Sequence, residues 1–193
     1  MHDSVLRFVR TSTREIGPGI EVLDVGAYDI NGSARTVFDG LEHTYLGIDL
    51  NEGPGVDIAG DAHELDKLID GRQFDVVLCL EMLEHDAAPW ITAGQLARAC
   101  RPGGVVLVTA RGNGFPLHNE PDCFRFMEAG LRAVLEAGGL QVLRIQPDPQ
   151  VSGWFANCTV GVELEMPKPA RKRGARKPEA APAVEPAEVA DGE

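Results

Sequence analysis

A glycine-containing turn and an acidic residue 23 positions further along the chain form the first candidate ligand site. Residues 24–29 read Asp-Val-Gly-Ala-Tyr-Asp after an apolar run, and Gly26 lets the backbone turn close to a ligand. Asp49 follows the next apolar run, near the spacing at which an acidic side chain accepts hydrogen bonds from a ribose diol. The pattern therefore favours a ribose-containing ligand. In the alternative interpretation, Gly26 serves only the steric needs of the turn, and Asp49 begins another turn at residues 51–54.

Acidic residues also follow two later apolar runs. Asp61, next to Ala62, follows a short run, where a carboxylate can hold the amino group of an adenine; its alternative role is to cap a helix. Residues 80–85 read Leu-Glu-Met-Leu-Glu-His, so two carboxylates and an imidazole follow the run 74–80. Because ligands of open α/β sheets bind beyond the carboxyl ends of the strands, we expect the reactive part of the ligand here.

Five short motifs, taken together, are similar to those of a known enzyme family. They are Val22–Gly26, Gly47–Asp49, Phe74–Val77, the Glu81-x-x-Glu84-His85 turn and Arg101–Val105. This set resembles the class I S-adenosylmethionine-dependent methyltransferases, in particular small members of type 11, over residues 18–165. The resemblance implies an enzyme that uses S-adenosylmethionine as its cofactor.

The same resemblance implies a fold and a set of cofactor contacts. The fold is a three-layer, Rossmann-like α/β sandwich around a mostly parallel seven-stranded sheet whose last strand is antiparallel. The turn around Gly26 would hold the methionine part of the cofactor, Asp49 the ribose and Asp61 the adenine. Leu80 and Glu81 would lie near the sulfonium. The full set of expected cofactor-binding residues is Asp24, Gly26, Ala27, Tyr28, Asp49, Leu50, Asp61, Ala62, Leu80 and Glu81.

The glycine turn departs from the family's Asp-x-Gly-x-Gly-x-Gly pattern. Tyr28 and Ile30 stand where glycines are usual, and Gly32 comes late. Tyr28 either closes over the methionine carboxylate or simply packs. A noncatalytic domain with the same fold stays open as an alternative.

Methyl transfer from a sulfonium is an in-line displacement, for which an enzyme aligns the reactants and adds a base if the nucleophile carries a proton. The candidate catalytic bases are His85 and His118, since an unperturbed imidazole titrates near about pH 6.5. In the alternative, His85 only forms a hydrogen bond at the start of the next helix. This chemistry requires no metal, and we expect no metal site. The expected acceptor is a small molecule with a hydroxyl or similar group.

The segment His118-x-x-Pro121-Asp122-x-x-Arg125-Phe126 is similar to one that covers the active site in many small methyltransferases of this class. Asp122 and Arg125 are therefore the expected substrate-binding residues. Arg125 either recognises an anionic substrate or pairs with Asp122 three residues earlier, and the sequence leaves both interpretations open.

Apolar runs alternate with segments of helical periodicity, which is typical of a mostly parallel sheet covered by helices on both faces. The continuous run Phe74–Leu80 predicts a central strand that is buried on both faces. Residues 141–145 and 155–164 predict two strands that pair antiparallel, because only a turn-rich segment joins them. The other expected strands cover 20–25, 43–49, 56–59 and 105–109. Helices are expected from Asp3 or Ser4 and around Ala34–Phe38, Leu65–Ile69, Trp90–Cys100 and Phe124–Leu135.

Composition limits the remaining function classes. The chain has 193 residues, of which 44% are hydrophobic, and a net charge of -12. An acidic field disfavours nucleic-acid binding, except through the basic stretch 168–177. The apolar runs are too short to span a bilayer, and the first residues do not resemble a secretory signal. We therefore expect a cytoplasmic protein without membrane contact, whose four widely spaced cysteines are reduced.

One domain followed by a tail is expected. Residues 1–166 form the methyltransferase-like domain with its N-terminal helix, and the Pro/Ala-rich, charged residues 167–193 form a disordered tail. Two other functions stay open: an NAD-type oxidoreductase, which shares the glycine turn and distant acid, and a noncatalytic Rossmann-like adaptor whose tail recruits a partner. The sequence also leaves the oligomeric state open.

Overall fold

A computed structural model describes residues 1–118 and 120–162, and the predicted tail at 167–193 lies outside them, as does its basic stretch 168–177. Seven strands form one sheet in the order β3-β2-β1-β4-β5-β7-β6. Five of them are parallel: β1 (Ile20–Val25), β2 (His43–Asp49), β3 (Ile58–Ala59), β4 (Phe74–Leu80) and β5 (Cys100–Arg111). β7 (Gly153–Thr159) is antiparallel to β5 and to β6 (Gln141–Pro147). The predicted mostly parallel sheet with a reversed last strand is therefore confirmed.

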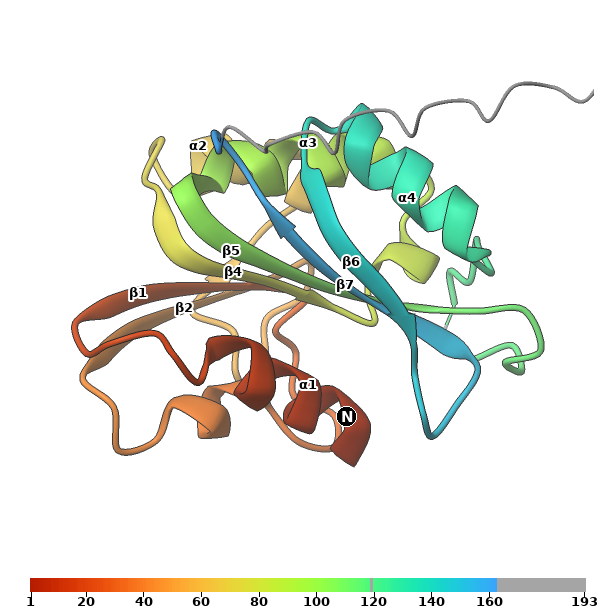
Figure 1. Ribbon diagram of the computed structural model, residues 1–193, viewed down its shortest axis with the longest axis horizontal. Helices are drawn as coiled ribbons and strands as arrows, with labels where there is room; N and C mark the ends of the chain where they lie inside the picture. The colour runs from red at the N-terminus through yellow and green to blue at the C-terminus, as the bar shows by residue number, and fades with distance from the viewer. Residues whose placement is uncertain (119, 163–193) are drawn as a thin grey trace, which may run out of the picture. The chain divides into compact units, whose positions relative to one another are not determined.

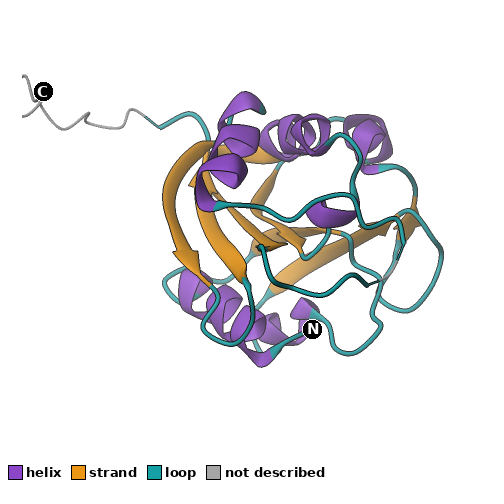
Figure 2. Ribbon diagram, turned by 90° about the vertical axis from the view of Figure 1, so that its right-hand side faces the viewer, coloured by secondary structure: helices purple, strands orange, loops and turns teal. Residues whose placement is uncertain are grey.

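Helices cover both faces of this sheet (Figure 1). On one face lie α1 (Asp3–Thr13) and the 3-10 helix η1 (Ala34–Phe38). On the other face lie α2 (Leu65–Leu68), α3 (Pro89–Ala99) and α4 (Glu128–Ala137). Two further 3-10 turns, η2 (Ala62–Glu64) and η3 (Leu83–His85), follow β3 and β4. Figure 2 shows the curved sheet between the two helical layers.

The central strand β4 shows why a continuous apolar run suits this position. Val76, Leu78 and Leu80 pack into the cluster that also holds α1 and η1. Val77 and Cys79 point the opposite way and join the cluster under α3 and α4. Because both faces of the strand are covered, successive positions must all be apolar, and each of these side chains is at most 5% exposed.

The start of α4 differs from the prediction. The apolar stripe from Phe124 onward predicted a helix there, but α4 begins at Glu128. The backbone N–H groups of Cys123 and Phe124 donate to the carbonyl of Glu84, and Phe126 forms a parallel bridge with Gly112. These backbone groups are thus committed to neighbouring segments, so residues 123–126 run extended along the end of the sheet and cannot join the helix.

The topology gathers the ends of the parallel strands at one edge. The side of the molecule that faces the viewer in Figure 2 carries several of the loops that join strands to helices.

Among residues 1–118 and 120–162, the structure has no helix with the length and apolar character that crossing a bilayer would require.

Candidate active site

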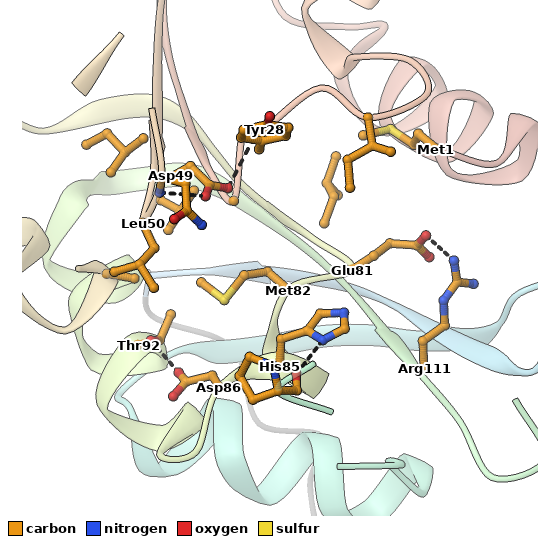
Figure 3. Close-up of a pocket in the computed structure, with 18 of the residues that line it drawn as sticks. Met1, Tyr28, Asp49, Leu50, Glu81, Met82, His85, Asp86, Thr92 and Arg111 are labelled. Atoms are coloured by element: carbon orange, nitrogen blue, oxygen red, sulfur yellow. Dashed lines mark hydrogen bonds and ion pairs between the residues drawn. The ribbon is translucent and has the colours of Figure 1, made fainter. Parts of the chain in front are cut away.

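A cleft of about 910 Å³ opens where the parallel strands end. Its lining includes residues that follow β1, β2, β3, β4 and β5, together with residues of the loop between β5 and α4 (Figure 3). Most of the expected cofactor-binding residues lie in this lining: Gly26, Tyr28, Asp49, Leu50, Asp61, Ala62, Leu80 and Glu81. The two candidate bases, His85 and His118, also line the cleft.

The turn after β1 requires glycine at one position. Gly26 has a φ of +90°, and a Cβ atom there would lie 2.9 Å from the Cβ of Met82, closer than side chains approach. The backbone N–H groups of Gly26 and Ala27 donate to the carbonyl of Ile48 at 2.8 and 3.0 Å. The turn is therefore fastened to the end of β2, and the Cβ of Ala27 is held near Gly47 of that strand.

Asp49 connects the turn after β1 to the loop after β2. One carboxylate oxygen accepts from the backbone N–H of Tyr28 at 3.2 Å, and the other accepts from that of Asn51 at 3.2 Å. Each oxygen can accept a further bond, and Asp49 lines the cleft beside Leu50 (Figure 3). The Tyr28 ring packs against Gly53, where a Cβ would come within 2.3 Å of the ring.

Asp61 has the helix-capping role that the sequence left as its alternative. Its carboxylate accepts from the backbone N–H of His63 at 2.8 Å, at the start of η2. His63 in turn lies 2.9 Å from the carboxylate of Asp86, which also accepts from the Thr92 hydroxyl at 2.6 Å. Asp61 and Ala62 still line the cleft, so capping leaves the carboxylate within reach of a ligand.

Glu81 stands in a conformation that few residues other than glycine adopt. Its φ is +58°, and its backbone N–H is held by the carbonyl and the hydroxyl of Thr109, both at 3.0 Å. Burial raises the pKa of Glu81 to about 7, against the opposing charge of Arg111, with which it forms an ion pair (Figure 3). Strained backbone of this kind clusters at functional sites, and here it turns a carboxylate toward the cleft.

Behind Glu81 lies a second, fully buried carboxylate. Glu84 is 0% exposed, and both of its oxygens lack a hydrogen-bond partner within the described part of the chain. The Nε atom of Arg111 lies 3.8 Å from Glu84, and its guanidinium stacks over the Phe115 ring at 4.2 Å. Burial raises the pKa of Glu84 above its ordinary value.

The two candidate bases lie against each other. The ring centroids of His85 and His118 are 5.0 Å apart in an edge-on arrangement. The Nδ1 atom of His85 lies 2.7 Å from the carbonyl oxygen of Pro121, so that nitrogen carries the proton and Nε2 keeps its lone pair. Burial, as the larger cause, and the neighbouring His85 both lower the pKa of His118. The structure thus brings together two imidazoles that the sequence separates by 33 positions.

Four of the expected site residues do not line the cleft. Asp24 is buried and accepts a hydrogen bond from the Tyr45 hydroxyl at 2.7 Å. Ala27 is buried behind the glycine turn. Asp122 and Arg125 pair with each other, and Arg125 also donates to the carbonyls of residues 115 and 116 at 3.0 and 2.8 Å. Of the two interpretations of Arg125, the structure therefore has the pairing with Asp122, which fastens the loop between β5 and α4.

The cleft also contains side chains that the sequence reasoning missed: Met82, His63, Asp86, Thr92, Arg111 and Phe115. Arg111 was accessible to that reasoning, because it is the last residue of β5 and residues at strand ends face ligands. Met82 has no comparable signal, since its place beside Gly26 depends on how two strands sit together in space.

The lining is strongly acidic. Within the described residues it includes the carboxylates of Asp49, Glu52, Asp61, Glu81, Asp86 and Glu120, against the guanidinium of Arg111 and the α-ammonium of Met1, and no lysine belongs to it. The guanidinium of Arg111 is already paired with Glu81. A ligand with positive charge suits this cleft better than an anionic one.

Comparison with known proteins gives a consistent family context. Residues 23–108 match the family described as "Methyltransferase domain". An alignment of 114 positions, which covers 52% of this chain and 48% of the relative, is 34% identical to the ubiquinone biosynthesis O-methyltransferase of Thiobacillus denitrificans. The chain therefore spans about half the length of the curated relative that it matches.

Solved structures share the fold. The 1,6-didemethyltoxoflavin-N1-methyltransferase of Burkholderia thailandensis, with bound 1,6-didemethyltoxoflavin and S-adenosylhomocysteine, aligns with a TM-score of 0.66 at 20% identity, covering 82% of this chain and 78% of that one. The magnesium protoporphyrin IX methyltransferase of Synechocystis PCC 6803, with bound S-adenosylmethionine, aligns with a TM-score of 0.60 at 17% identity, covering 82% and 77%. At these identities the likeness shows the fold.

Proposed function

We propose that the chain is a class I S-adenosylmethionine-dependent methyltransferase that binds this cofactor and methylates a hydroxyl or similar group of a small-molecule acceptor. One observation carries the proposal: the glycine turn after β1 and the carboxylate of Asp49 meet at the same end of one cleft. The curated relative is an O-methyltransferase, which supports an oxygen atom as the acceptor.

The residues present fit S-adenosylmethionine. A cleft of about 910 Å³ lies within the roughly 300–1,000 Å³ that small-molecule sites occupy. Asp49 and Asp61 offer acceptors for ribose hydroxyls and an adenine amino group, and Leu50, Leu80 and Met82 offer apolar surface. When bound, S-adenosylmethionine supplies a methyl group on a positively charged sulfur, and the acidic lining suits that charge.

The same lining argues against the oxidoreductase alternative. The diphosphate of NAD needs basic side chains or the N-terminus of a helix against it. Here the segment after the glycine turn is the short 3-10 helix η1, whose first free N–H is taken by its own cap Ser33. The guanidinium of Arg111 is paired with Glu81.

The chain's own residues arrange the acceptor end of the cleft. His85, from η3, and His118, from the loop after β5, line the cleft with their ring centroids 5.0 Å apart. Their imidazoles are the groups that would hold or receive the proton of an acceptor hydroxyl. Phe115 and Pro121, from the same loop, also line the cleft and offer apolar surface to an acceptor.

Calorimetric titration tests the proposal. The full chain, in buffer containing a chelator, is titrated with S-adenosylmethionine and separately with NAD; we expect micromolar binding of the first and no heat from the second. In Asp49→Ala the loss of hydrogen bonds to a charged group, worth about 1.5–3 kcal/mol, should weaken binding by about 10- to 150-fold.

Asp66→Ala is the matched control, because Asp66 is exposed on α2 and does not line the cleft. Its affinity should equal that of the unmodified chain. Absence of S-adenosylmethionine binding would favour the noncatalytic adaptor, and binding of NAD alone would favour the oxidoreductase. Equal affinity in Asp49→Ala would show that the cofactor lies elsewhere.

A further inference from the structure

We propose that Glu84, His85 and His118 bind a divalent transition-metal ion at the acceptor end of the cleft. One potential ligand atom from each residue lies within 4.8 Å of the other two, although the residues come from η3 and from the loop after β5. A modest side-chain adjustment would bring the three atoms to the roughly 2.0–2.2 Å that zinc–nitrogen and zinc–oxygen bonds require. The sequence pattern predicted no metal site, because this cluster forms only when the loop folds back over η3.

The carboxylate of Glu84 is the strongest reason for a cation here. It is fully buried, and neither oxygen has a hydrogen-bond partner among the described residues. A buried carboxylate without partners is costly unless a cation balances it. Arg111 forms an ion pair with Glu84, but its Nε atom lies 3.8 Å away, too far for a hydrogen bond, and one of its terminal nitrogens donates to Glu81.

Each of the two imidazoles has a ring nitrogen that could bind a metal ion. His85 is held through Nδ1 by the carbonyl of Pro121 at 2.7 Å, which leaves the Nε2 lone pair free. A backbone carbonyl on the second nitrogen is one of the groups with which proteins orient metal-binding histidines. His118 has a buried Nδ1 atom without a hydrogen-bond partner in the described residues, and Asp122 stays 3.8 Å from it.

The donor set indicates the class of ion. Two imidazoles and one carboxylate suit zinc, iron(II) or manganese, and are unlike the all-oxygen sites of magnesium and calcium. Three protein ligands leave further coordination positions open. Because His85 and His118 line the cleft while Glu84 lies behind them, the open positions face the cleft.

This site would activate the acceptor, and that role rests on the proposed function. A hydroxyl bound to the ion has a lowered pKa, so its O–H bond breaks, water takes the proton, and the oxygen keeps the electron pair and stays bound to the metal. The two histidines would then act as metal ligands instead of bases. In the competing arrangement, Arg111 alone balances Glu84 and no ion binds.

Direct metal binding tests the inference without requiring methyl transfer. The full chain, stripped with a chelator and dialysed, is titrated with zinc chloride by calorimetry and with cobalt(II) chloride by visible absorption. We expect one ion per chain and a cobalt spectrum of four or five coordination with nitrogen and oxygen ligands. Glu84→Gln and His118→Ala should each weaken zinc binding by about 10-fold or more.

Two controls exclude other donors. Cys123→Ser removes the one exposed thiol of the described residues, and His43→Gln removes an imidazole outside the cleft; neither should change zinc affinity. Glu84→Gln should fold, because glutamine keeps the shape of the glutamate side chain. Circular dichroism and urea unfolding test this. Failure of the unmodified chain to bind one ion, or equal affinity in both cluster variants, would overturn the proposal.

The two proposals fail separately. Binding of S-adenosylmethionine in the presence of chelator, together with no metal binding, would overturn the metal site alone. Metal binding that depends on Glu84 and His118, together with no binding of S-adenosylmethionine, would overturn the proposed function and leave the metal site standing.

Discussion

Replacing Asp24 with asparagine should stabilise the fold at neutral and alkaline pH. Asp24 lies on β1 between β2 and β4, its side chain is buried, and it accepts a hydrogen bond from the Tyr45 hydroxyl at 2.7 Å. Burial raises the pKa of Asp24 from 3.8 to about 6, although the Tyr45 hydrogen bond and the charge of Arg35 favour the ionised form. An asparagine oxygen can accept the same hydrogen bond without a charge.

The magnitude follows from the two pKa values. The unfolded chain releases the Asp24 proton near 3.8 and the folded chain near 6, so the folded chain binds more protons between them. The stabilising contribution of the protonated carboxyl is therefore fully present below about pH 4 and is lost as the pH rises through 6. A difference of about 2 pH units, at about 1.4 kcal/mol each, corresponds to a cost of about 3 kcal/mol for ionised Asp24 above about pH 7. About half of that cost develops between about pH 5 and pH 8.

Urea unfolding of the unmodified chain and Asp24→Asn at several pH values measures this cost. Other buried acids, Glu81 and Glu84 among them, also titrate, but their contributions cancel in the difference between the two proteins. The free energy of unfolding of the variant should gain on that of the unmodified chain by 1–2 kcal/mol, roughly, as the pH rises from about 5 to 8. Asp66→Asn, at an exposed position, should show no such trend. A difference that stays constant with pH would refute the assignment of a raised pKa to Asp24.

Two further predictions concern the glycine turn and the loop over the cleft. Gly26→Ala should lower the free energy of unfolding by about 2 kcal/mol, because alanine resists a φ of +90° and its Cβ would press on Met82. The matched variant Gly130→Ala, at an open position in α4, should raise it by about 0.5–1 kcal/mol, and urea unfolding of both distinguishes the two effects. Arg125→Ala should release residues 115–118, with a loss of about 2 kcal/mol of local stability and amide hydrogen exchange there faster by roughly 30-fold. Unchanged exchange would mean that Arg125 does not hold the loop.

The strands and helices could be predicted from the sequence where a local pattern of apolar residues is compatible with only one type of secondary structure. The apolar run at residues 74–80 forms the central strand β4. The strands β6 and β7, joined without a helix, pair antiparallel as predicted. The prediction of a helix from Phe124 failed because the apolar spacing of residues 124–127 also suits an extended segment. Hydrogen bonds from distant residues, here to Glu84 and Arg111, decided between the two.

The candidate site was predictable where it follows the ends of strands. Gly26, Asp49 and Glu81 each come directly after an apolar run, and parallel topology brings the three to one edge. The pairing of His85 with His118 could not be predicted in this way. It depends on the loop after β5 folding back until Pro121 meets His85, and the sequence carries no periodic signal for that contact.

In the glycine turn after β1, the backbone φ angle decides which positions need glycine, whatever the family motif has there. Within the described residues 26–32, positive φ angles occur at Gly26 and Gly32, at +90° and +119°, and not at Tyr28 or Ile30. Side chains at residues 28 and 30 therefore cause no backbone strain, and the N–H of Tyr28 still reaches Asp49. The chain keeps glycine at the two positions where the backbone needs it. Departure from the family pattern at residues 28 and 30 is thus compatible with a turn that still holds a ligand.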